Sequence, residues 1–138
     1  MYPPELVRPM REELSSKGVK ELHTAEEVDA TLQTEEGTVL VVVNSVCGCA
    51  AGAARPGVLK AISSEGKLPN TVATVFAGVD REATDKARAY MAPFPPSSPS
   101  IALFKDGNLV HMVQRHHIEG RSADLIAANL TAAFDEFC

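Results

Sequence analysis

The chain has 138 residues, of which 45% are hydrophobic and 22% charged, a composition typical of one globular domain with a buried core. Its formal net charge of −5, without a basic run, argues against a nucleic-acid surface, and its longest apolar run (residues 39–43) is too short to span a membrane. The first residues lack the basic and apolar regions of a secretory signal, so we expect a cytoplasmic protein. No repeat, low-complexity tract or linker divides the sequence, which predicts a single domain over residues 1–138.

Two helices are predicted before the first strand. Residues 4–17 carry apolar side chains at helical spacing, with Pro9 either starting or kinking the helix. The stripe consists of Leu6, Val7, Met10 and Leu14. Thr24-Ala25-Glu26-Glu27 is a capping box that opens a second helix, which we expect to end near Glu36-Gly37.

The stretch over residues 38–54 combines a buried strand, two cysteines and the start of a helix. Residues 39–43 are consecutive aliphatic side chains, as in a strand that is covered on both faces. Cys47 and Cys49 follow, separated by Gly48, and an alanine-rich segment then favours helix. Pro56 must kink or restart that helix because it has no N–H group.

The second half of the chain predicts two further helices and three strands. A strand over residues 72–77 is followed by a helix that Asp80 caps and that continues through Met91. A proline-rich loop over residues 93–99 precedes strands 101–105 and 109–113, which Asp106-Gly107-Asn108 joins as a tight hairpin. The last helix runs over residues 122–137. Its predicted inward face comprises Leu125, Ile126, Leu130, Ala133, Phe134 and Phe137.

This order of elements is that of a thioredoxin-like α/β fold, in which two strands joined by a helical crossover precede a helix, an antiparallel hairpin and a terminal helix. We therefore predict a central mixed sheet of about four strands, flanked by helices, with extra helices at the N-terminus. The fold places a pair of cysteines after the first sheet strand, where Cys47 and Cys49 stand. It also places a proline, usually cis, before the third strand, where Pro99 follows Ser98.

The cysteine pair predicts thiol-disulfide chemistry. Three cysteines, two of them nearly adjacent, do not make a disulfide framework, and a helix N-terminus favours a thiolate. We expect Cys47 to be the outer, attacking thiol and Cys49 to be the resolving one. Gly48 is expected to provide the positive φ that closing so small a ring requires, and the strained disulfide to be oxidising.

Several neighbouring residues are candidates for supporting roles. Asn44 and Ser45 precede the cysteines and either bond the thiolate or cap the helix, with capping favoured. Arg55 lies eight residues beyond Cys47 and is expected at the surface, and residues 115–117 (Arg-His-His) are expected in a solvated turn. Cys138 is either an inert terminal residue or a third thiol that exchanges with Cys49.

One long run carries a family resemblance: Val41-Val42-Val43-Asn44-Ser45-Val46-Cys47-Gly48-Cys49-Ala50-Ala51-Gly52-Ala53-Ala54-Arg55-Pro56. With it, the chain resembles the bacilliredoxins, thioredoxin-like proteins with Cys-Gly-Cys. Further matching segments are residues 7–11, 75–78, 96–100 and 116–120 and the final Cys138.

The resemblance implies an enzyme that removes a low-molecular-weight thiol, bacillithiol, from mixed disulfides on cytosolic proteins, with disulfide reductase or isomerase activity. A cis Ser98-Pro99 bond would then present backbone beside Cys47 to the substrate. No bound cofactor is expected, because the glycines form neither a dinucleotide nor a phosphate fingerprint. The small thiol would be a co-substrate and the thiolated proteins the partners.

Two other classes of function compete with this hypothesis. Cys47, Cys49, Cys138 and a histidine could together hold zinc or an iron–sulfur cluster, although one Cys-x-Cys supplies only two ligands. The chain could also be a binding module without catalysis, which two intact cysteines make less attractive.

Overall fold

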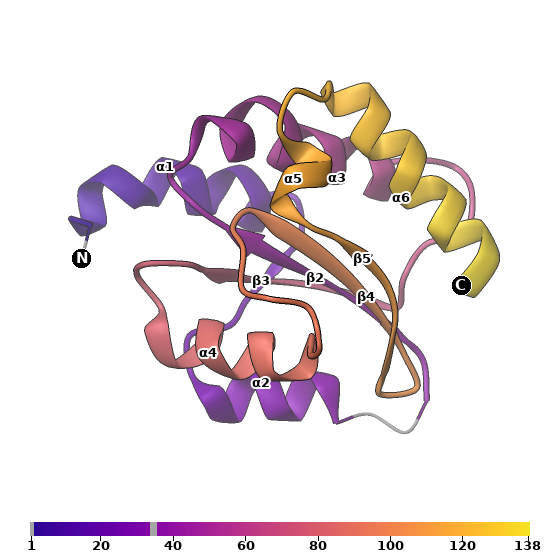
Figure 1. The fold of residues 1–138 in the computed structure, drawn as a ribbon, viewed down its shortest axis with the longest axis horizontal. Helices are drawn as coiled ribbons and strands as arrows, with labels where there is room; N and C mark the ends of the chain where they lie inside the picture. Colours follow the sequence, from indigo (N-terminus) through magenta and orange to yellow (C-terminus); the bar gives the residue numbers. More distant parts are fainter. Residues whose placement is uncertain (1, 34–35) are drawn as a thin grey trace.

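The computed structural model describes residues 2–33 and 36–138, which form a five-stranded sheet with helices on both faces (Figure 1). The strands are β1 (Lys20–Glu21), β2 (Thr38–Asn44), β3 (Thr71–Phe76), β4 (Ser100–Lys105) and β5 (Asn108–Val113). The helices are α1 (Pro4–Ser15), α2 (Ala25–Leu32), the π-helix η1 (Ala50–Ala54), α3 (Arg55–Ile62), α4 (Arg81–Tyr90), α5 (Arg115–Ile118) and α6 (Ala123–Phe137). No helix in the described ranges is both long enough and apolar enough to cross a membrane.

The sheet has the order β1-β3-β2-β4-β5, so β2 lies in its centre. Strand β2 is parallel to β3 and antiparallel to β4, and β5 pairs antiparallel with β4. The predicted mixed sheet is confirmed, but it has five strands rather than about four. The additional strand β1 comprises two residues parallel to β3, too short a segment to show alternation in the sequence.

Strand β2 divides the interior into two cores. Leu40 and Val42 belong to one apolar cluster, with α3 and α6, while Val39, Val41 and Val43 belong to the other, with α2 and α4. Figure 1 shows α1, α3, α5 and α6 on one side of the sheet and α2 and α4 on the other. Because both faces are covered, every residue of β2 is buried, as its unbroken aliphatic run predicted.

Most predicted helix boundaries agree with the structure, but two apolar residues that were predicted to be buried are exposed. Helix α1 continues through Pro9, and α2 ends at Leu32, before the predicted Glu36-Gly37; residues 34–35 of that prediction lie outside the described residues. Leu6 and Leu125, predicted to face inward, are 47% and 57% exposed. Each stands at the edge of its apolar stripe, where helical spacing alone does not decide burial.

Local turn and cap signals agree with the structure. Thr24 accepts a hydrogen bond from the Glu27 N–H, confirming the capping residue of α2. Asp106 and Gly107 both have positive φ, 52° and 83°, in the tight turn between β4 and β5. The Ser98-Pro99 bond is cis, as predicted, and so is Ala92-Pro93, which was not predicted.

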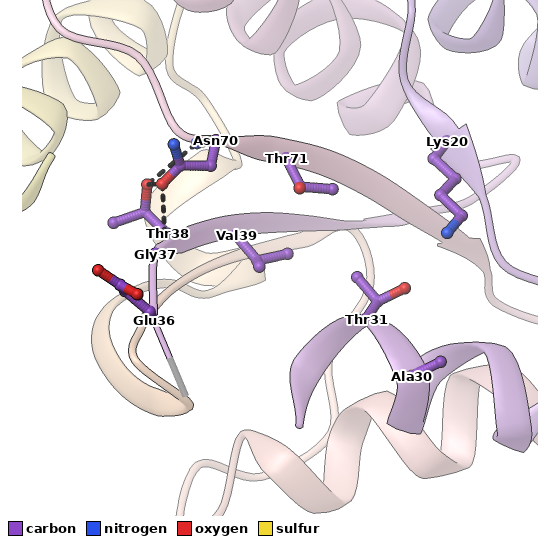
Figure 2. Close-up of a pocket in the computed structure, with 9 residues that line it drawn as sticks. All are labelled: Lys20, Ala30, Thr31, Glu36, Gly37, Thr38, Val39, Asn70 and Thr71. Carbon is purple, nitrogen blue, oxygen red and sulfur yellow. Dashed lines mark hydrogen bonds between the residues drawn. The ribbon is translucent and has the colours of Figure 1, made fainter. Parts of the chain in front are cut away.

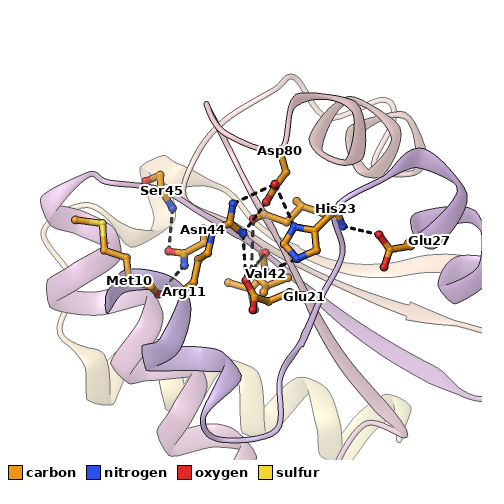
Figure 3. Close-up of polar contacts among 11 residues, drawn as sticks. Met10, Arg11, Glu21, His23, Glu27, Val42, Asn44, Ser45 and Asp80 are labelled. Atoms are coloured by element: carbon orange, nitrogen blue, oxygen red, sulfur yellow. Dashed lines mark hydrogen bonds and ion pairs between the residues drawn. The ribbon is translucent and has the colours of Figure 1, made fainter. Parts of the chain in front are cut away.

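Helix α1 is held to the sheet by a polar cluster that Figure 3 shows. The Arg11 guanidinium donates two hydrogen bonds to Asp80, at 2.8 and 3.0 Å, and one to Glu21 at 3.1 Å. Asp80 precedes α4, but its carboxylate accepts from Arg11 and contacts His23 at 3.2 Å instead of capping the helix. The cluster thus joins α1, β1 and the β3–α4 connection beside the C-terminal end of β2.

A cavity of about 260 Å³ lies at the opposite, N-terminal end of β2 (Figure 2). Asn70 there accepts hydrogen bonds from the Thr38 N–H, at 2.8 Å, and from its hydroxyl, at 3.2 Å. Seven residues of β2, about 20 Å at about 3.3 Å per residue, separate this cavity from the cysteine end of the strand. It is therefore not part of the cysteine site.

Candidate active site

Cys47 stands at the start of the helical segment that follows β2. Its carbonyl accepts hydrogen bonds from the N–H groups of Ala50, at 3.0 Å, and Ala51, at 3.2 Å, so the first helical bonds begin at Cys47. Cys49 has helical backbone angles and lies in the first turn, as predicted. The helix then continues as η1 into α3, so Pro56 falls at the start of a new α-helical segment, where its missing N–H is tolerated.

The Cys47 sulfur is positioned by backbone and hydroxyl groups of its own loop. The Cys49 N–H donates to Cys47 Sγ at 3.4 Å, and the Ser45 Oγ accepts from the Cys47 N–H at 3.2 Å. Ser45 thereby holds the turn that carries the thiol, ahead of the first helical hydrogen bonds, and does not cap the helix as favoured from the sequence. An N–H group directed at the sulfur stabilises the thiolate more than the neutral thiol.

The two thiols differ in acidity. The pKa of Cys47 is lowered, first by the hydrogen bond from the Cys49 N–H and also by the Cys49 thiol and the positive charge of Arg115. The pKa of Cys49 is raised, first by the hydrogen bond that its thiol makes with Cys47 and then by desolvation. Of the two thiols, Cys47 is therefore the one that loses its proton more readily.

Arg115 was expected in a solvated turn: its side chain is exposed to solvent, but it lies in a short helix instead of a turn. The residue opens the short helix α5, and its guanidinium donates to the carbonyl of Ser98 at 3.2 Å while it also bonds Glu119. These contacts hold the charge close enough to Cys47 to lower the pKa of the thiol. Strand pairing between β4 and β5 brings Arg115 to the end of the sheet where Cys47 lies, a relation that local sequence does not reveal.

Arg55 was expected at the surface, and this expectation was wrong. The residue is only 3% exposed, and its guanidinium donates to Asn44 Oδ1 at 2.9 Å and to the Ser45 carbonyl at 3.0 Å. It also pairs with Glu13 of α1 at 3.1 Å. Arg55 thus fixes the end of β2 from which the cysteine loop departs, rather than contacting the thiol.

Asn44 was expected to cap the helix or to bond the thiolate, and it does neither. Its Oδ1 accepts from the Ser45 N–H at 2.9 Å and from Arg55, while its Nδ2 donates to the carbonyl of Met10 at 3.1 Å (Figure 3). Asn44 is buried and connects α1, the end of β2 and α3. Asn44 therefore fixes the backbone at the start of the cysteine loop and makes no hydrogen bond to the Cys47 sulfur.

Gly48 does not have the positive φ that was predicted for it. Its backbone is not in the left-handed region, and a Cβ added to it would meet no atom within 4 Å. All three cysteines are free thiols in this structure, so no ring is closed over Gly48. In this dithiol form, Gly48 leaves open space beside the pair rather than providing an unusual backbone conformation.

A cavity of about 440 Å³ opens beside Cys47 and identifies the reactive face of the site. Ser45, Cys47 and Ser98 line it, together with Arg115 and with Arg88 of α4. Cys49 is not part of this lining and instead packs against the core formed with α3 and α6. The cavity thus opens on Cys47 and not on Cys49, and sequence reasoning missed Arg88 because only the fold brings α4 to the cavity.

Ser98 and Pro99, the predicted substrate-binding residues, lie immediately before β4. Ser98 lines the same cavity as Cys47, whereas Pro99 is buried. The Ser98 carbonyl accepts the bond from Arg115. The structure thus brings Ser98 to the cysteine site, and the role of Ser98 and Pro99 in binding substrate stays a prediction.

Cys138 is not brought to the cysteine pair. An added Cβ at Gly57, near the start of α3, would meet Ile126 at 2.7 Å, and one at Gly66, beyond the end of α3, would meet Asp135 at 3.5 Å. Helices α3 and α6 therefore run in the same direction, with the C-terminus at the end remote from Cys49 (Figure 1). Among the described residues, no cluster of three or more His, Cys, Asp or Glu side chains is arranged to hold a metal.

The sequence is similar to those of known thiol-disulfide proteins. The disulphide isomerase family model matches residues 2–138. A bacilliredoxin of Cytophaga hutchinsonii is 60% identical over 136 residues, covering 99% of both chains, and one of Bacillus licheniformis is 53% identical over 137 residues, covering 99% of this chain and 95% of the relative.

Solved structures confirm the fold. Thioredoxin from Schistosoma mansoni superposes with a TM-score of 0.59 at 18% identity, covering 87% of this chain and 98% of the other. Thioredoxin from Malassezia sympodialis gives 0.54 at 13% identity, covering 87% and 90%. With Cys47, whose pKa is lowered, beside Cys49 on this fold, the chain belongs to the bacilliredoxin family of thiol-disulfide oxidoreductases.

Proposed function

We propose that this oxidoreductase removes a low-molecular-weight thiol such as bacillithiol from mixed disulfides on cytosolic proteins. The observation that carries the proposal is the position of Cys47. Its sulfur accepts a hydrogen bond from the Cys49 N–H, and the residue lines a cavity large enough for a small ligand. The relatives named bacilliredoxins support the choice of bacillithiol as the small thiol.

In the first step, the Cys47 thiolate attacks the sulfur of the small thiol in the mixed disulfide. A bond forms between Cys47 and the small thiol while the old disulfide bond breaks, and the client cysteine leaves as a thiolate that takes a proton from water. One disulfide replaces another, so no electrons enter or leave the system. The reaction needs an accessible thiolate, which the lowered pKa of Cys47 supplies.

In the second step, the Cys47 mixed disulfide is resolved. The Cys49 thiol, whose pKa is raised, loses its proton as it attacks Cys47, releases the small thiol and forms a Cys47–Cys49 disulfide. Two electrons from an external dithiol, or from two monothiols, then restore both thiols. The same attack on a protein disulfide, followed by release to another client cysteine, would give isomerase activity.

The test uses a client protein with a single cysteine in a mixed disulfide with bacillithiol. Incubation with the Cys49→Ser variant should move the bacillithiol mass from the client onto Cys47, while the Cys47→Ser variant should leave it on the client. The wild-type chain should release free bacillithiol and lose two hydrogens as its disulfide closes. Absence of transfer to Cys47, with stoichiometric metal bound through Cys47 and Cys49, would refute the proposal in favour of a metal site.

A further inference from the structure

A second cavity, of about 410 Å³, lies against α4 and adjoins the cavity beside Cys47. Gly78 and Arg88 line both cavities, so the two spaces meet at these residues. Neither cysteine of the pair lines the second cavity, and no step of the proposed reaction uses it. This space, the α4 cavity, is lined by Gly78, Val79, Arg81, Thr84, Asp85 and Arg88.

The polar wall of the α4 cavity comes from one face of α4. Arg81, Thr84 and Arg88 are spaced three and four residues apart, which places their side chains in one row along the helix. Thr84, in the middle of this row, is only 2% exposed. Arg81 is exposed at the start of the helix, and Arg88 is half-buried near its end. The helix therefore presents a buried hydroxyl between two guanidinium groups.

Two polar atoms of this row have no hydrogen-bond partner. Among the described residues, three buried side-chain atoms lack a partner, and two of them are Thr84 Oγ1 and Arg88 Nε. Native proteins pair nearly all of their buried polar atoms, so an unpaired one calls for a physical explanation. Both residues line the same cavity, and an acceptor bound there would supply the missing partner.

The α4 cavity also carries positive charge without a compensating partner. Arg81 and Arg88 make no ion pair with any described residue, and Asp85, which also lines the cavity, pairs with neither. Two arginines and one aspartate give the wall a net charge of +1, in a chain whose net charge is −5. A carboxylate complements such a wall, because a guanidinium pairs with it in a bidentate geometry and a hydroxyl can donate to it.

The position of the α4 cavity indicates which molecule brings the carboxylate. In the first step of the proposed reaction, three sulfur atoms lie in line and the client cysteine is at the outer end. The client segment around that cysteine therefore lies at the mouth of the Cys47 cavity, which Gly78 and Arg88 share with the α4 cavity. Because an extended chain advances about 3.3 Å per residue, a side chain a few residues from the client cysteine reaches this distance.

We propose that the α4 cavity binds an acidic side chain of the client protein, near in sequence to the modified cysteine, and so makes this enzyme selective among client sites. The inference rests on the proposed function and adds the recognition of the client. It does not depend on which small thiol is transferred. Arg81 is the better residue for testing it, because Arg88 also lines the Cys47 cavity.

The experiment uses synthetic peptides with a single cysteine held in a mixed disulfide with bacillithiol. A glutamate is placed in turn at each of the four positions before and after the cysteine, and each peptide has a partner with glutamine at the same position. Transfer to Cys47 is followed by mass in the Cys49→Ser background. The readout is the ratio of the glutamate rate to the glutamine rate. The small thiol and the reactivity of Cys47 cancel in this ratio.

We expect a ratio of about five or more for at least one position, and added salt should reduce it. Arg81→Gln and Arg88→Gln should each lower that ratio to about two or less, because each removes a charged donor. Thr84→Val should lower it about twofold without reducing the free energy of unfolding, since the hydroxyl it removes has no partner in the free chain.

Lys86→Gln is the matched control. Lys86 lies on the same helix, pairs with Asp29 and lines neither cavity. Its substitution removes one positive charge from α4, as Arg81→Gln does, and should leave the ratio within about 1.5-fold of its original value. Any effect of the glutamate on the reactivity of its own peptide disulfide is the same for every enzyme variant, so only the cavity variants should change the ratio.

The outcomes separate the two claims. If no peptide transfers bacillithiol to Cys47, the proposed function fails. If the peptides transfer but no position gives a ratio above about two, or if any of the three cavity variants leaves the ratio unchanged, the proposed function stands and the client site is refuted. If Lys86→Gln lowers the ratio as much as Arg81→Gln, general charge attraction selects acidic clients, and the α4 cavity is again refuted as the site.

Discussion

Replacing Arg55 with methionine should destabilise the fold without removing the cysteines. Methionine keeps an apolar chain of similar length in the buried space but cannot donate. Three acceptors lose their donor: the Asn44 Oδ1, the Ser45 carbonyl and the Glu13 carboxylate. The change therefore tests the conclusion that Arg55 is a buried residue that fixes the end of β2.

The magnitude follows from what each acceptor can do next. The buried Ser45 carbonyl is left unpaired, at about 1–3 kcal/mol, and the loss at Asn44 is about 1 kcal/mol because its Oδ1 keeps the Ser45 N–H. Glu13 is 37% exposed and can be rehydrated, so its ion pair contributes no more than about 1 kcal/mol. We expect the free energy of unfolding to fall by about 3 kcal/mol.

Urea unfolding of the reduced chain measures this loss. With an m-value of about 2 kcal/mol/M, the midpoint should fall by about 1.5 M. Arg8→Met is the matched control, because Arg8 is exposed on the same side of the molecule in α1 and should change stability by no more than about 0.5 kcal/mol. An Arg55→Met chain that unfolds at the wild-type midpoint would show that these hydrogen bonds do not hold the loop.

Four further predictions test other parts of the molecule. Because the pKa of Cys47 is lowered and that of Cys49 raised, alkylation by iodoacetamide should begin at Cys47 below the ordinary thiol pKa of about 8.5 and at Cys49 only above it; equal pH profiles would contradict the assignment. Arg115→Gln should move the Cys47 profile to higher pH, which peptide mapping of the alkylated chain would detect. Gly57→Ala should destabilise the chain by about 1–3 kcal/mol in urea, since its Cβ would stand 2.7 Å from a side chain of α6; an unchanged midpoint would mean that α6 shifts freely. Cys138→Ala should leave the transfer rate unchanged, because the C-terminus lies at the remote end of α6.

Local patterns were sufficient for most of the helices and strands and for the place of the cysteine pair. The aliphatic run of β2, the cap at Thr24, the Asp106-Gly107 turn and the period of α6 each depend on residues close together in sequence, so their physics is readable there. Cys47 and Cys49 belong to the same class of feature. Their place after a buried strand and at a helix start follows from neighbours in the chain.

The surroundings of the pair depended on the tertiary structure. Arg115, Arg88 and Ser98 reach the cavity from three separate segments, which only sheet pairing and helix packing bring together. Arg55 illustrates the same limit, because its acceptors in α1 and at the end of β2 lie 10 to 42 residues away in the sequence. A charged residue with no partner among its sequence neighbours is predicted to lie at the surface. A sequence shows which groups a chain carries, but the burial and pairing of a charge are set by long-range contacts, and these decide whether an arginine is solvated, structural or part of the site.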